Sequence, residues 1–226
     1  MERKIVRTGD GSRTIQLTDL NEQYHSLHGA VQEAYHVFIE AGLRQFADRE
    51  LSILEVGVGT GLNALITLVE APSSDLRLQY TALETAPVTE VEWRELDYGS
   101  ALDTSGAALW YEELHRCPWE ESFTLRDGFT LTKRNTDLRQ FVAPAPLYDL
   151  IYFDAFGARV QPDLWTEDIF RRMFSALKPG GILVTYSAKG SVRRAMETVG
   201  FCTERLPGPP GKREMLRASK PQNTPS

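Results

Sequence analysis

The stretch Leu54-Glu-Val-Gly57-Val-Gly59-Thr-Gly61-Leu-Asn63 decides the fold, because it follows a continuous apolar segment and precedes a helix-forming one. Glycines at such a turn let the backbone bend tightly and approach a ligand that a Cβ atom would exclude. The spacing is G-x-G-x-G, whereas a dinucleotide-binding loop needs its third glycine where Leu62 stands, and no P-loop lysine follows. The pattern favours a nucleoside ligand without phosphates, of which S-adenosylmethionine is the common case. A structural turn without a ligand is the alternative.

Strand-like and helix-like segments alternate along most of the chain. Continuous apolar runs predict strands at 51–56, 77–84, 147–153 and 181–186. Helical spacing of apolar residues predicts helices at 61–70, 87–98, 103–115, 166–177 and 191–199. The segment 123–134 is strand-like but is interrupted by the turn dipeptide Asp127-Gly128, and Pro179-Gly-Gly181 is expected to end a helix. This alternation predicts an α/β fold of the Rossmann-like type, with a mostly parallel, seven-stranded sheet covered by helices on both faces.

The two ends of the chain are expected to add to this core. Residues 6–17 predict a small β-hairpin around Gly9-Asp-Gly11, and 29–41 predict an amphipathic helix. The strand-like segments 201–206 and 214–218 are joined too tightly for a crossover helix, so they predict an antiparallel hairpin at the sheet edge. We expect one domain over 1–220, with 1–45 as an N-terminal extension and 221–226 as a disordered tail.

Composition narrows the class of protein. With 226 residues, 42% hydrophobic and 25% charged, the chain has the profile of an ordinary globular protein, and no apolar run approaches the ~20 residues that cross a bilayer. The N-terminus lacks a secretory signal pattern. Cys117 and Cys202 lie far apart, and the four histidines form no ligand-like cluster. These features favour a cytoplasmic protein with no membrane span, no disulfide framework and no metal site.

Charge is distributed unevenly. The net charge is −6, yet residues 189–220, which we call the basic strip, hold eight basic and three acidic residues. The strip includes Arg193, Arg194, Lys212 and Arg213. A local basic surface on an acidic protein is suited to contact a phosphate backbone at one edge. A solvated surface with no partner is an equally open interpretation.

Three acidic residues follow predicted strands. Glu84 ends the strand after the glycine loop, where a carboxylate accepts hydrogen bonds from ribose hydroxyls. Asp137 is a candidate acceptor for an adenine amino group, or a helix N-cap. Asp154 ends the buried strand 147–153 and is expected to face the reacting centre, because ligands bind outside the carboxyl ends of such strands. Phe156 and Trp165 are either apolar walls of the site or ordinary core residues.

Several segments resemble one known family. They are Tyr24-His-Ser-Leu-His-Gly29-Ala-Val-Gln-Glu33, Glu55-Val-Gly-Val-Gly-Thr-Gly-Leu-Asn63, Phe153-Asp-Ala-Phe156, Pro162-Asp-Leu-Trp165-Thr with Phe170, and Val192-Arg-Arg194 with Gly200-Phe201 and Gly211-Lys-Arg-Glu-Met215. Together they span most of residues 24–218 and are similar to the methyltransferase domain of the MnmC family, bacterial enzymes that modify the wobble uridine of tRNA. The family often has Asp-Gly-Phe-(Ala)-Pro where this chain has Asp154-Ala-Phe-Gly-Ala158, so we expect an acceptor loop of different shape.

The resemblance implies a class I methyltransferase. It implies methyl transfer from S-adenosylmethionine to the amine of 5-aminomethyl-2-thiouridine, giving 5-methylaminomethyl-2-thiouridine at the tRNA wobble position. The implied cofactor-binding residues are Gly57, Gly59, Gly61, Glu84 and Asp137, and Asp154 is the implied acid at the amine. We expect Phe156, Trp165 and the basic strip to contact the substrate tRNA. Fused family members also carry an FAD-dependent oxidase domain, for which we expect no room in this chain.

Two other functions remain as alternatives. An aminopropyltransferase resembling spermidine synthase would share the fold, the ribose-binding acid and an acidic amine pocket. A non-catalytic RNA-binding scaffold would share the fold alone and have no need of the glycine loop, Glu84 and Asp154 together. For methyl transfer, an ordinary Asp pKa of about 3.9 suggests that Asp154 orients the amine and stabilises developing charge rather than acting as a strong base.

Overall fold

The computed structural model describes residues 2–46, 50–71 and 77–222, and its centre is an eight-stranded sheet. Its strands are β4 (Leu51–Val56), β5 (Leu78–Leu83), β6 (Ser122–Arg126), β7 (Phe129–Arg134), β8 (Tyr148–Phe153), β9 (Leu177–Thr185), β10 (Cys202–Pro207) and β11 (Glu214–Ser219). They lie in the order β10-β11-β9-β8-β4-β5-β7-β6, with β9, β8, β4, β5 and β7 parallel. The sheet has one strand more than the seven expected, because the Asp127-Gly128 turn divides 123–134 into the antiparallel pair β6 and β7.

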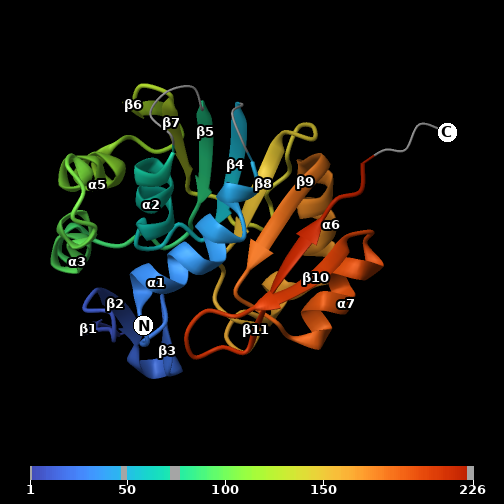
Figure 1. Ribbon diagram of the computed structural model, residues 1–226, viewed down its shortest axis with the longest axis horizontal. Coiled ribbons are helices and arrows are strands. Elements are labelled where there is room, and N and C mark those ends of the chain that lie inside the picture. The colour runs from blue at the N-terminus through green and yellow to red at the C-terminus, as the bar shows by residue number, and fades with distance from the viewer. Residues whose placement is uncertain (1, 47–49, 72–76, 223–226) are drawn as a thin grey trace.

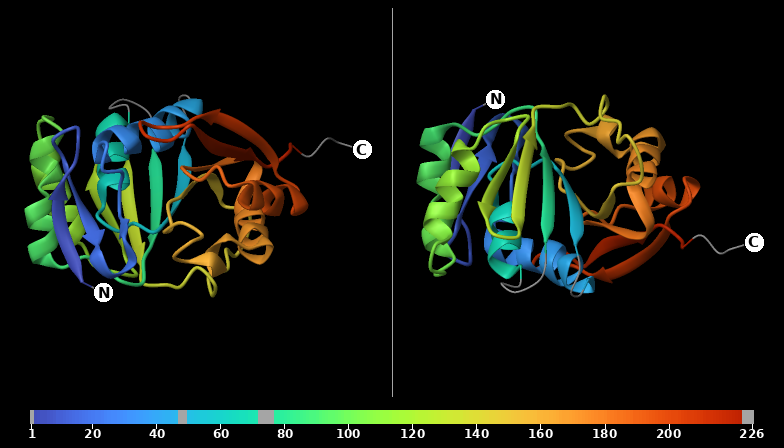
Figure 2. Two further views of the ribbon diagram at one scale, coloured as in Figure 1. Left: turned by 90° about the horizontal axis from the view of Figure 1, so that it is seen from below. Right: turned by 90° about the horizontal axis from the view of Figure 1, so that it is seen from above.

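Helices cover both faces of this sheet, as predicted (Figure 1). Side chains of successive strand residues point to opposite faces. Ile53 of β4 therefore packs in one core with α1 (Ala30–Ala34), α2 (Leu62–Glu70) and α5 (Ala107–Arg116). Its neighbour Leu54 packs in a second core with α6 (Glu167–Ala176) and α7 (Gly190–Thr198). Figure 2 shows the same arrangement from below and from above.

A second, small sheet lies below the carboxyl ends of the main strands in Figure 1. It consists of β1 (Arg3–Arg7), β2 (Arg13–Leu17) and β3 (Glu22–Gln23). The predicted hairpin is confirmed by the β1–β2 pairing, whereas the two-residue β3 gave no signal in the sequence. The expected helix 29–41 consists of α1 and a π-helical continuation, Tyr35–Glu40. The helix α3 (Glu90–Leu96) contacts β1, and α4 (Tyr98–Ala101) contacts α5.

One predicted boundary is wrong at the C-terminal part of the sheet. Pro179-Gly-Gly181 lies inside β9, which begins at Leu177 directly after α6. The segment is extended because Gly180 N donates to Lys220 O and Lys220 N donates to Gly181 O, both at 2.9 Å. The predicted antiparallel pair is confirmed as β10 and β11, with β11 beside β9.

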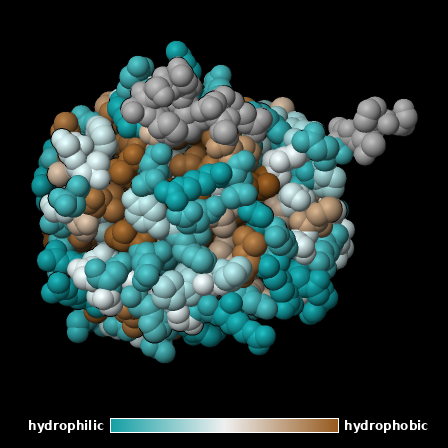
Figure 3. All heavy atoms as spheres, viewed as in Figure 1, coloured by the Kyte–Doolittle hydropathy of each residue, from teal (hydrophilic) through white to brown (hydrophobic). Residues whose placement is uncertain are grey.

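Hydrophilic side chains cover most of the face shown in Figure 3, with apolar ones visible between them. Within the described ranges, no helix is long and apolar enough to cross a membrane. The single domain over 1–220 stays a prediction. Of the predicted tail, residues 223–226 lie outside the described part of the chain.

Candidate functional site

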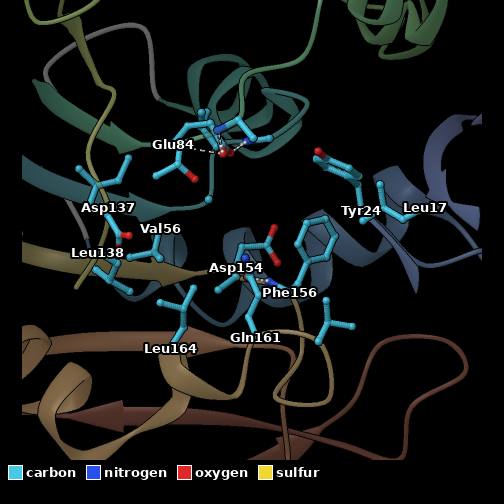
Figure 4. Close-up of a pocket in the computed structure, with 18 of the residues that line it drawn as sticks. Leu17, Tyr24, Val56, Glu84, Asp137, Leu138, Asp154, Phe156, Gln161 and Leu164 are labelled. Atoms are coloured by element: carbon cyan, nitrogen blue, oxygen red, sulfur yellow. Dashed lines mark hydrogen bonds between the residues drawn. The ribbon is translucent and has the colours of Figure 1, made fainter. Parts of the chain in front are cut away.

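Two adjoining cavities lie at the carboxyl ends of the parallel strands. The first has a volume of about 430 Å³ and is lined by the glycine loop and by the ends of β5, β7 and β8 (Figure 4). The second, of about 340 Å³, lies between residues 22–28 and the loop that joins β10 to β11. The residues that line both cavities are Tyr24, His25, Asp154, Ala155 and Phe156. The two cavities therefore meet beside Asp154.

The glycine loop shapes the first cavity with two of its three glycines. Gly57 and Gly59 line the cavity with φ values of +82° and +49°, in the left-handed region that favours glycine. A Cβ atom on Gly59 would lie 3.0 Å from the ring of Tyr24. Gly61 also has a positive φ, but its Cβ position lies 2.8 Å from Leu114 of α5 and it is not among the cavity-lining residues described. The absence of a Cβ atom on Gly61 thus allows the loop to pack closely against α5.

Glu84 is fixed at the end of β5 with its carboxylate at the first cavity (Figure 4). Its Oε2 accepts a hydrogen bond from Gly59 N at 2.9 Å. Its Oε1 accepts from the backbone amides of Thr85 and Ala86 at 2.8 and 2.9 Å. Each carboxylate oxygen has two acceptor positions, so this carboxylate is held in place by three hydrogen bonds and keeps one acceptor position, on Oε2, for a ligand hydroxyl group.

Asp137 lies at the far end of the same cavity; a turn rather than a helix follows it, so the N-cap interpretation is wrong, and the adenine contact stays a prediction. Its Oδ1 accepts from Arg139 N at 2.8 Å, which caps the turn that follows. The Arg139 side chain pairs with this carboxylate at 2.5 Å and lowers the pKa of Asp137. Beside it, Leu138, Leu164 and Val56 provide apolar walls (Figure 4). This end of the cavity is suited to a flat apolar ring with a polar edge.

Asp154 is connected to the interior of the sheet by a buried polar chain. Asn63 donates through Nδ2 to Asp154 Oδ2 at 2.8 Å and to Glu55 Oε1 at 2.9 Å. The Tyr80 hydroxyl donates to Glu55 Oε2 at 2.9 Å. Burial raises the pKa of Glu55 to about 7, against the hydrogen bonds from Tyr80 and Asn63 that lower it. Neither Asn63 nor Glu55 was predicted as a site residue.

The pKa of Asp154 lies well above its ordinary value, so the expectation of an ordinary pKa is wrong. Burial is the largest cause, and the nearby charges of Glu33 and Glu55 raise the pKa further. The hydrogen bond from Asn63 and the charge of Lys212 act in the opposite direction. Because its pKa is raised, the Asp154 carboxylate accepts a proton more readily than a solvated aspartate does.

The second cavity contains an ion pair that the sequence did not predict. Lys212 Nζ lies 2.7 Å from Glu33 Oε1, and Glu33 Oε2 accepts from Ser26 N at 2.7 Å. The same ammonium lies 4.0 Å from the centre of the Tyr186 ring. Lys212 was predicted to contact tRNA as part of the basic strip, but the structure places its side chain in this cavity.

The other predicted residues of the basic strip lie outside both cavities. Arg193 pairs with Glu197 at 2.6 Å along α7. Arg194, next to it, is exposed, and Arg213 is exposed beside Lys212. Any contact of these three arginines with RNA would be made outside the two cavities.

The two predicted aromatic residues have different positions. Phe156 lines both cavities and packs edge-on against Tyr24, with ring centres 4.9 Å apart. Trp165 is buried against Phe153 and Phe170, and it lines neither of the cavities described here. Its indole donates to Phe156 O at 2.8 Å, so Trp165 supports the loop that carries Phe156. For Trp165 the core interpretation is the one that agrees with the structure.

Sequence reasoning missed the part that the N-terminal extension plays in the site. Tyr24, His25 and Glu33 line the cavities, although they precede the glycine loop by more than twenty residues. His25 is buried, contacts Thr60 Oγ1 at 2.7 Å and has its pKa lowered to about 4 by burial, so its imidazole is neutral. The segment 24–33 gave a signal only through its resemblance to family sequences.

Comparisons with known proteins agree with this architecture. Residues 107–221, half of the chain, match a family model described as S-adenosyl-L-methionine-dependent methyltransferase. The tRNA 5-methylaminomethyl-2-thiouridine biosynthesis bifunctional protein MnmC of Cupriavidus necator is 32% identical over 89% of this chain and 32% of the relative. The MnmC protein of Burkholderia multivorans is also 32% identical, over 85% of this chain and 31% of the relative. The chain thus spans about a third of the length of these relatives.

Solved structures give the same result. The crystal structure of MNMC2 from Aquifex aeolicus is 26% identical, with a TM-score of 0.76, covering 100% of this chain and 72% of that one. Spermidine synthase from Thermotoga maritima, with 12% identity and a TM-score of 0.52, shares the fold alone. The family model matches half of the chain, and the glycine loop and the fixed Glu84 agree with that match. The chain therefore belongs to the S-adenosyl-L-methionine-dependent methyltransferase family.

Proposed function

We propose that this chain transfers a methyl group from S-adenosylmethionine to the amine of 5-aminomethyl-2-thiouridine at the wobble position of tRNA, forming 5-methylaminomethyl-2-thiouridine. The single observation that carries the proposal is the position of Asp154, whose carboxylate lies where two adjoining cavities meet. The substrate is proposed from the named function of the MnmC relatives, which the chain matches over 85–89% of its own length. We further propose that the reaction takes place in the cytoplasm, where tRNA is modified.

The first cavity fits the cofactor. Glu84 would accept from a ribose hydroxyl through Oε2, and Leu138 and Leu164 would enclose the adenine, with Asp137 at its amino edge. Gly57 and Gly59 would allow close approach of the backbone, because neither carries a Cβ atom. The bound cofactor supplies a methyl group on a sulfonium: a new N–C bond forms as the S–C bond breaks, leaving S-adenosylhomocysteine.

The second cavity would take the acceptor amine. Its charged side chains include the carboxylates of Asp154 and Glu33 and the ammonium of Lys212. Since Lys212 is paired with Glu33, Asp154 supplies a carboxylate beyond that pair and suits one cationic amine. Tyr24 and Phe156 line both cavities and would restrict the path between them.

Asp154 would hold the amine and receive its proton. An amine must be neutral to attack, and the nitrogen becomes a secondary ammonium as the new bond forms. The raised pKa of Asp154 makes its carboxylate a better proton acceptor, and its negative charge stabilises the developing ammonium. Alignment of the two reacting groups across the cavity junction supplies much of the acceleration.

The experiment incubates purified protein with S-adenosylmethionine and tRNA that carries 5-aminomethyl-2-thiouridine, and analyses the digested nucleosides by mass spectrometry. We expect conversion to the methylaminomethyl nucleoside. Calorimetry distinguishes the alternatives: binding of S-adenosylhomocysteine supports methyl transfer, and binding of 5′-methylthioadenosine alone supports an aminopropyltransferase. Binding of neither supports a non-catalytic scaffold.

A further inference from the structure

Asn63 joins the carboxylate of Asp154 to the interior of the molecule. It is the second residue of α2, is 2% exposed, and is not among the described residues that line the two cavities. Its Nδ2 lies 2.8 Å from Asp154 Oδ2 and 2.9 Å from Glu55 Oε1. One amide group therefore spans two carboxyl groups, that of Glu55 in β4 and that of Asp154 directly after the neighbouring strand β8.

The orientation of this amide is determined by its neighbours. The amide turns its N–H groups toward Asp154 Oδ2 and Glu55 Oε1, and a carboxyl oxygen can accept from it whether the acid is ionised or protonated. The opposite orientation would require both acids to be protonated. The amide oxygen, Asn63 Oδ1, is buried and has no hydrogen-bond partner among the described residues. The arrangement thus uses only the donating side of this amide, at the cost of an unpaired buried acceptor.

Glu55 in turn fixes Asn63. It is fully buried in β4, and its second oxygen accepts from the Tyr80 hydroxyl at 2.9 Å. The chain Tyr80–Glu55–Asn63–Asp154 thus runs from β5 through β4 and α2 to the cavity junction. Asp154 Oδ2 is the oxygen that it holds. No hydrogen bond among the described residues reaches Oδ1, which is left to meet a ligand.

We propose that Asn63 is a positioning residue for methyl transfer: its amide, held by Glu55, fixes the Asp154 carboxylate so that Oδ1 faces the acceptor nitrogen. This inference rests on the proposed function, in which Asp154 meets the acceptor amine. Asn63 touches neither cofactor nor acceptor. Its effect on the reaction passes through Asp154.

The groups around Asp154 determine the pH dependence that this role predicts. The charged groups are Glu55 from β4, Glu33 from α1 and Lys212 from the β10–β11 loop. The uncharged groups are the amide of Asn63 from α2, the hydroxyls of Tyr80 in β5 and Tyr186 after β9, and the neutral imidazole of His25 at the same cavities. The Asn63 hydrogen bond stabilises the ionised form and lowers the pKa of Asp154, whereas the charge of Glu55 raises it. The two neighbours therefore act in opposite directions.

The test compares Asn63→Leu with the wild type in methyl transfer to tRNA carrying the aminomethyl nucleoside, over a range of pH. We expect kcat to fall on the order of tenfold or more, because the carboxylate loses its fixed orientation. The acid limb of the kcat profile should move to higher pH, since the ionised form loses a donor. The affinity for S-adenosylhomocysteine should stay within about threefold. Thr67→Val is the matched control, since Thr67 is buried one turn further along α2 and donates to Asn63 O instead.

Glu55→Gln tests the same chain without removing Asn63. The glutamine oxygen can still accept from Asn63, while the negative charge is lost, so the acid limb should move to lower pH. This opposite shift keeps the proposal falsifiable if Asn63→Leu does not fold.

A double variant separates this role from a structural one. In an Asp154→Asn background, Asn63→Leu should cause no further loss of kcat, because its effect passes through Asp154. If Asp154→Asn methylates as fast as the wild type, the proposed function of Asp154 fails. If Asp154→Asn is slow but Asn63→Leu leaves kcat and the acid limb unchanged, or slows the double variant further, only the role of Asn63 is overturned.

Discussion

Lys212 Nζ lies 2.7 Å from Glu33 Oε1, so the loop between β10 and β11 is tied to α1 across the second cavity. The two residues are separated by 179 positions in the sequence. Glu33 is largely buried, and its other oxygen is held by Ser26 N. The wall of the proposed acceptor cavity is therefore built jointly by the two ends of the chain.

Removing this ammonium should impair the acceptor side of the reaction selectively. Lys212→Met leaves the buried carboxylate of Glu33 without its cationic partner, so we expect kcat/KM for tRNA to fall about tenfold or more. Lys212 does not line the first cavity, so S-adenosylhomocysteine affinity should be unchanged. Lys178→Met is the matched control, since Lys178 pairs with the buried Asp149 at 2.8 Å near the start of β8. An equal loss of activity in both variants would contradict the prediction.

Glu84→Ala should weaken cofactor binding by about 1.5–3 kcal/mol, the usual range for losing hydrogen bonds to a charged group. The variant removes the proposed ribose acceptor and also the partner of Gly59 N. Isothermal titration with S-adenosylhomocysteine measures the effect. An affinity equal to that of the wild type would remove Glu84 from the cofactor site.

Gly59→Ala and Gly61→Ala form a matched pair. Both introduce a Cβ at a positive φ, so each should lose about 1–2 kcal/mol of stability. Of the two new Cβ atoms, only that at position 59 would meet the ring of Tyr24 at the first cavity, whereas that at position 61 would meet Leu114 of α5. We therefore expect a loss of S-adenosylhomocysteine affinity of about tenfold for Gly59→Ala alone. Equal affinities for the two variants would show that the loop does not shape the cavity as described.

Glu55 should make folding stability depend on pH. Its pKa is raised from an ordinary 4.5 to about 7, so between these values the folded state binds more protons than the unfolded state. Stability from this group therefore falls as pH rises from about 4.5 to 7. The free energy of unfolding of Glu55→Gln, relative to wild type, should rise by up to about 3 kcal/mol between pH 5 and 8. Denaturant titrations at these two pH values measure it, and a pH-independent difference would contradict the raised pKa.

Arg194 and Arg213 should affect RNA binding and leave chemistry intact. If both contact phosphates, their joint replacement by Gln should reduce the slope of log affinity against log salt by about 0.7–0.9 for each lost contact. The methylation rate at saturating tRNA should be unchanged. Arg94 and Arg116, exposed on α3 and α5 and paired with Glu90, are the control pair. An unaltered salt slope would mean that the basic strip is only a solvated surface.

The parts of the site that could be predicted from the sequence are those whose signal is local. β4 has the predicted bounds, 51–56, because a continuous apolar run between turns has few other stable arrangements. Glu84 and Asp154 were found because ligand-facing acids of such sheets follow the strand ends. The extended conformation of Pro179-Gly-Gly181 depends on pairing with Lys220, which no local pattern contains.

The second cavity, which we propose takes the acceptor amine, could not be predicted because its contacts are also absent from any local sequence pattern. Glu33 and Lys212 meet only after the N-terminal extension and the C-terminal hairpin have packed on the same edge of the sheet. Phe156 and Trp165 are both aromatic and lie nine positions apart, yet Phe156 lines the cavity whereas Trp165 packs against Phe153 and Phe170. Asn63 was visible in the sequence, but its bridging contacts to Glu55 and Asp154 depend on three separate elements.

The most direct measurement is the single-turnover rate of methyl transfer to tRNA carrying 5-aminomethyl-2-thiouridine, at saturating S-adenosylmethionine, for the wild type and Asp154→Asn. Asp154→Asn preserves the shape of the side chain at the cavity junction and removes its charge. We predict that the wild type forms the methylaminomethyl nucleoside and that the variant is slower by about 100-fold or more, with S-adenosylhomocysteine affinity within about threefold. A wild type that binds the cofactor but leaves the nucleoside unmethylated, or a variant as fast as the wild type, would contradict the account.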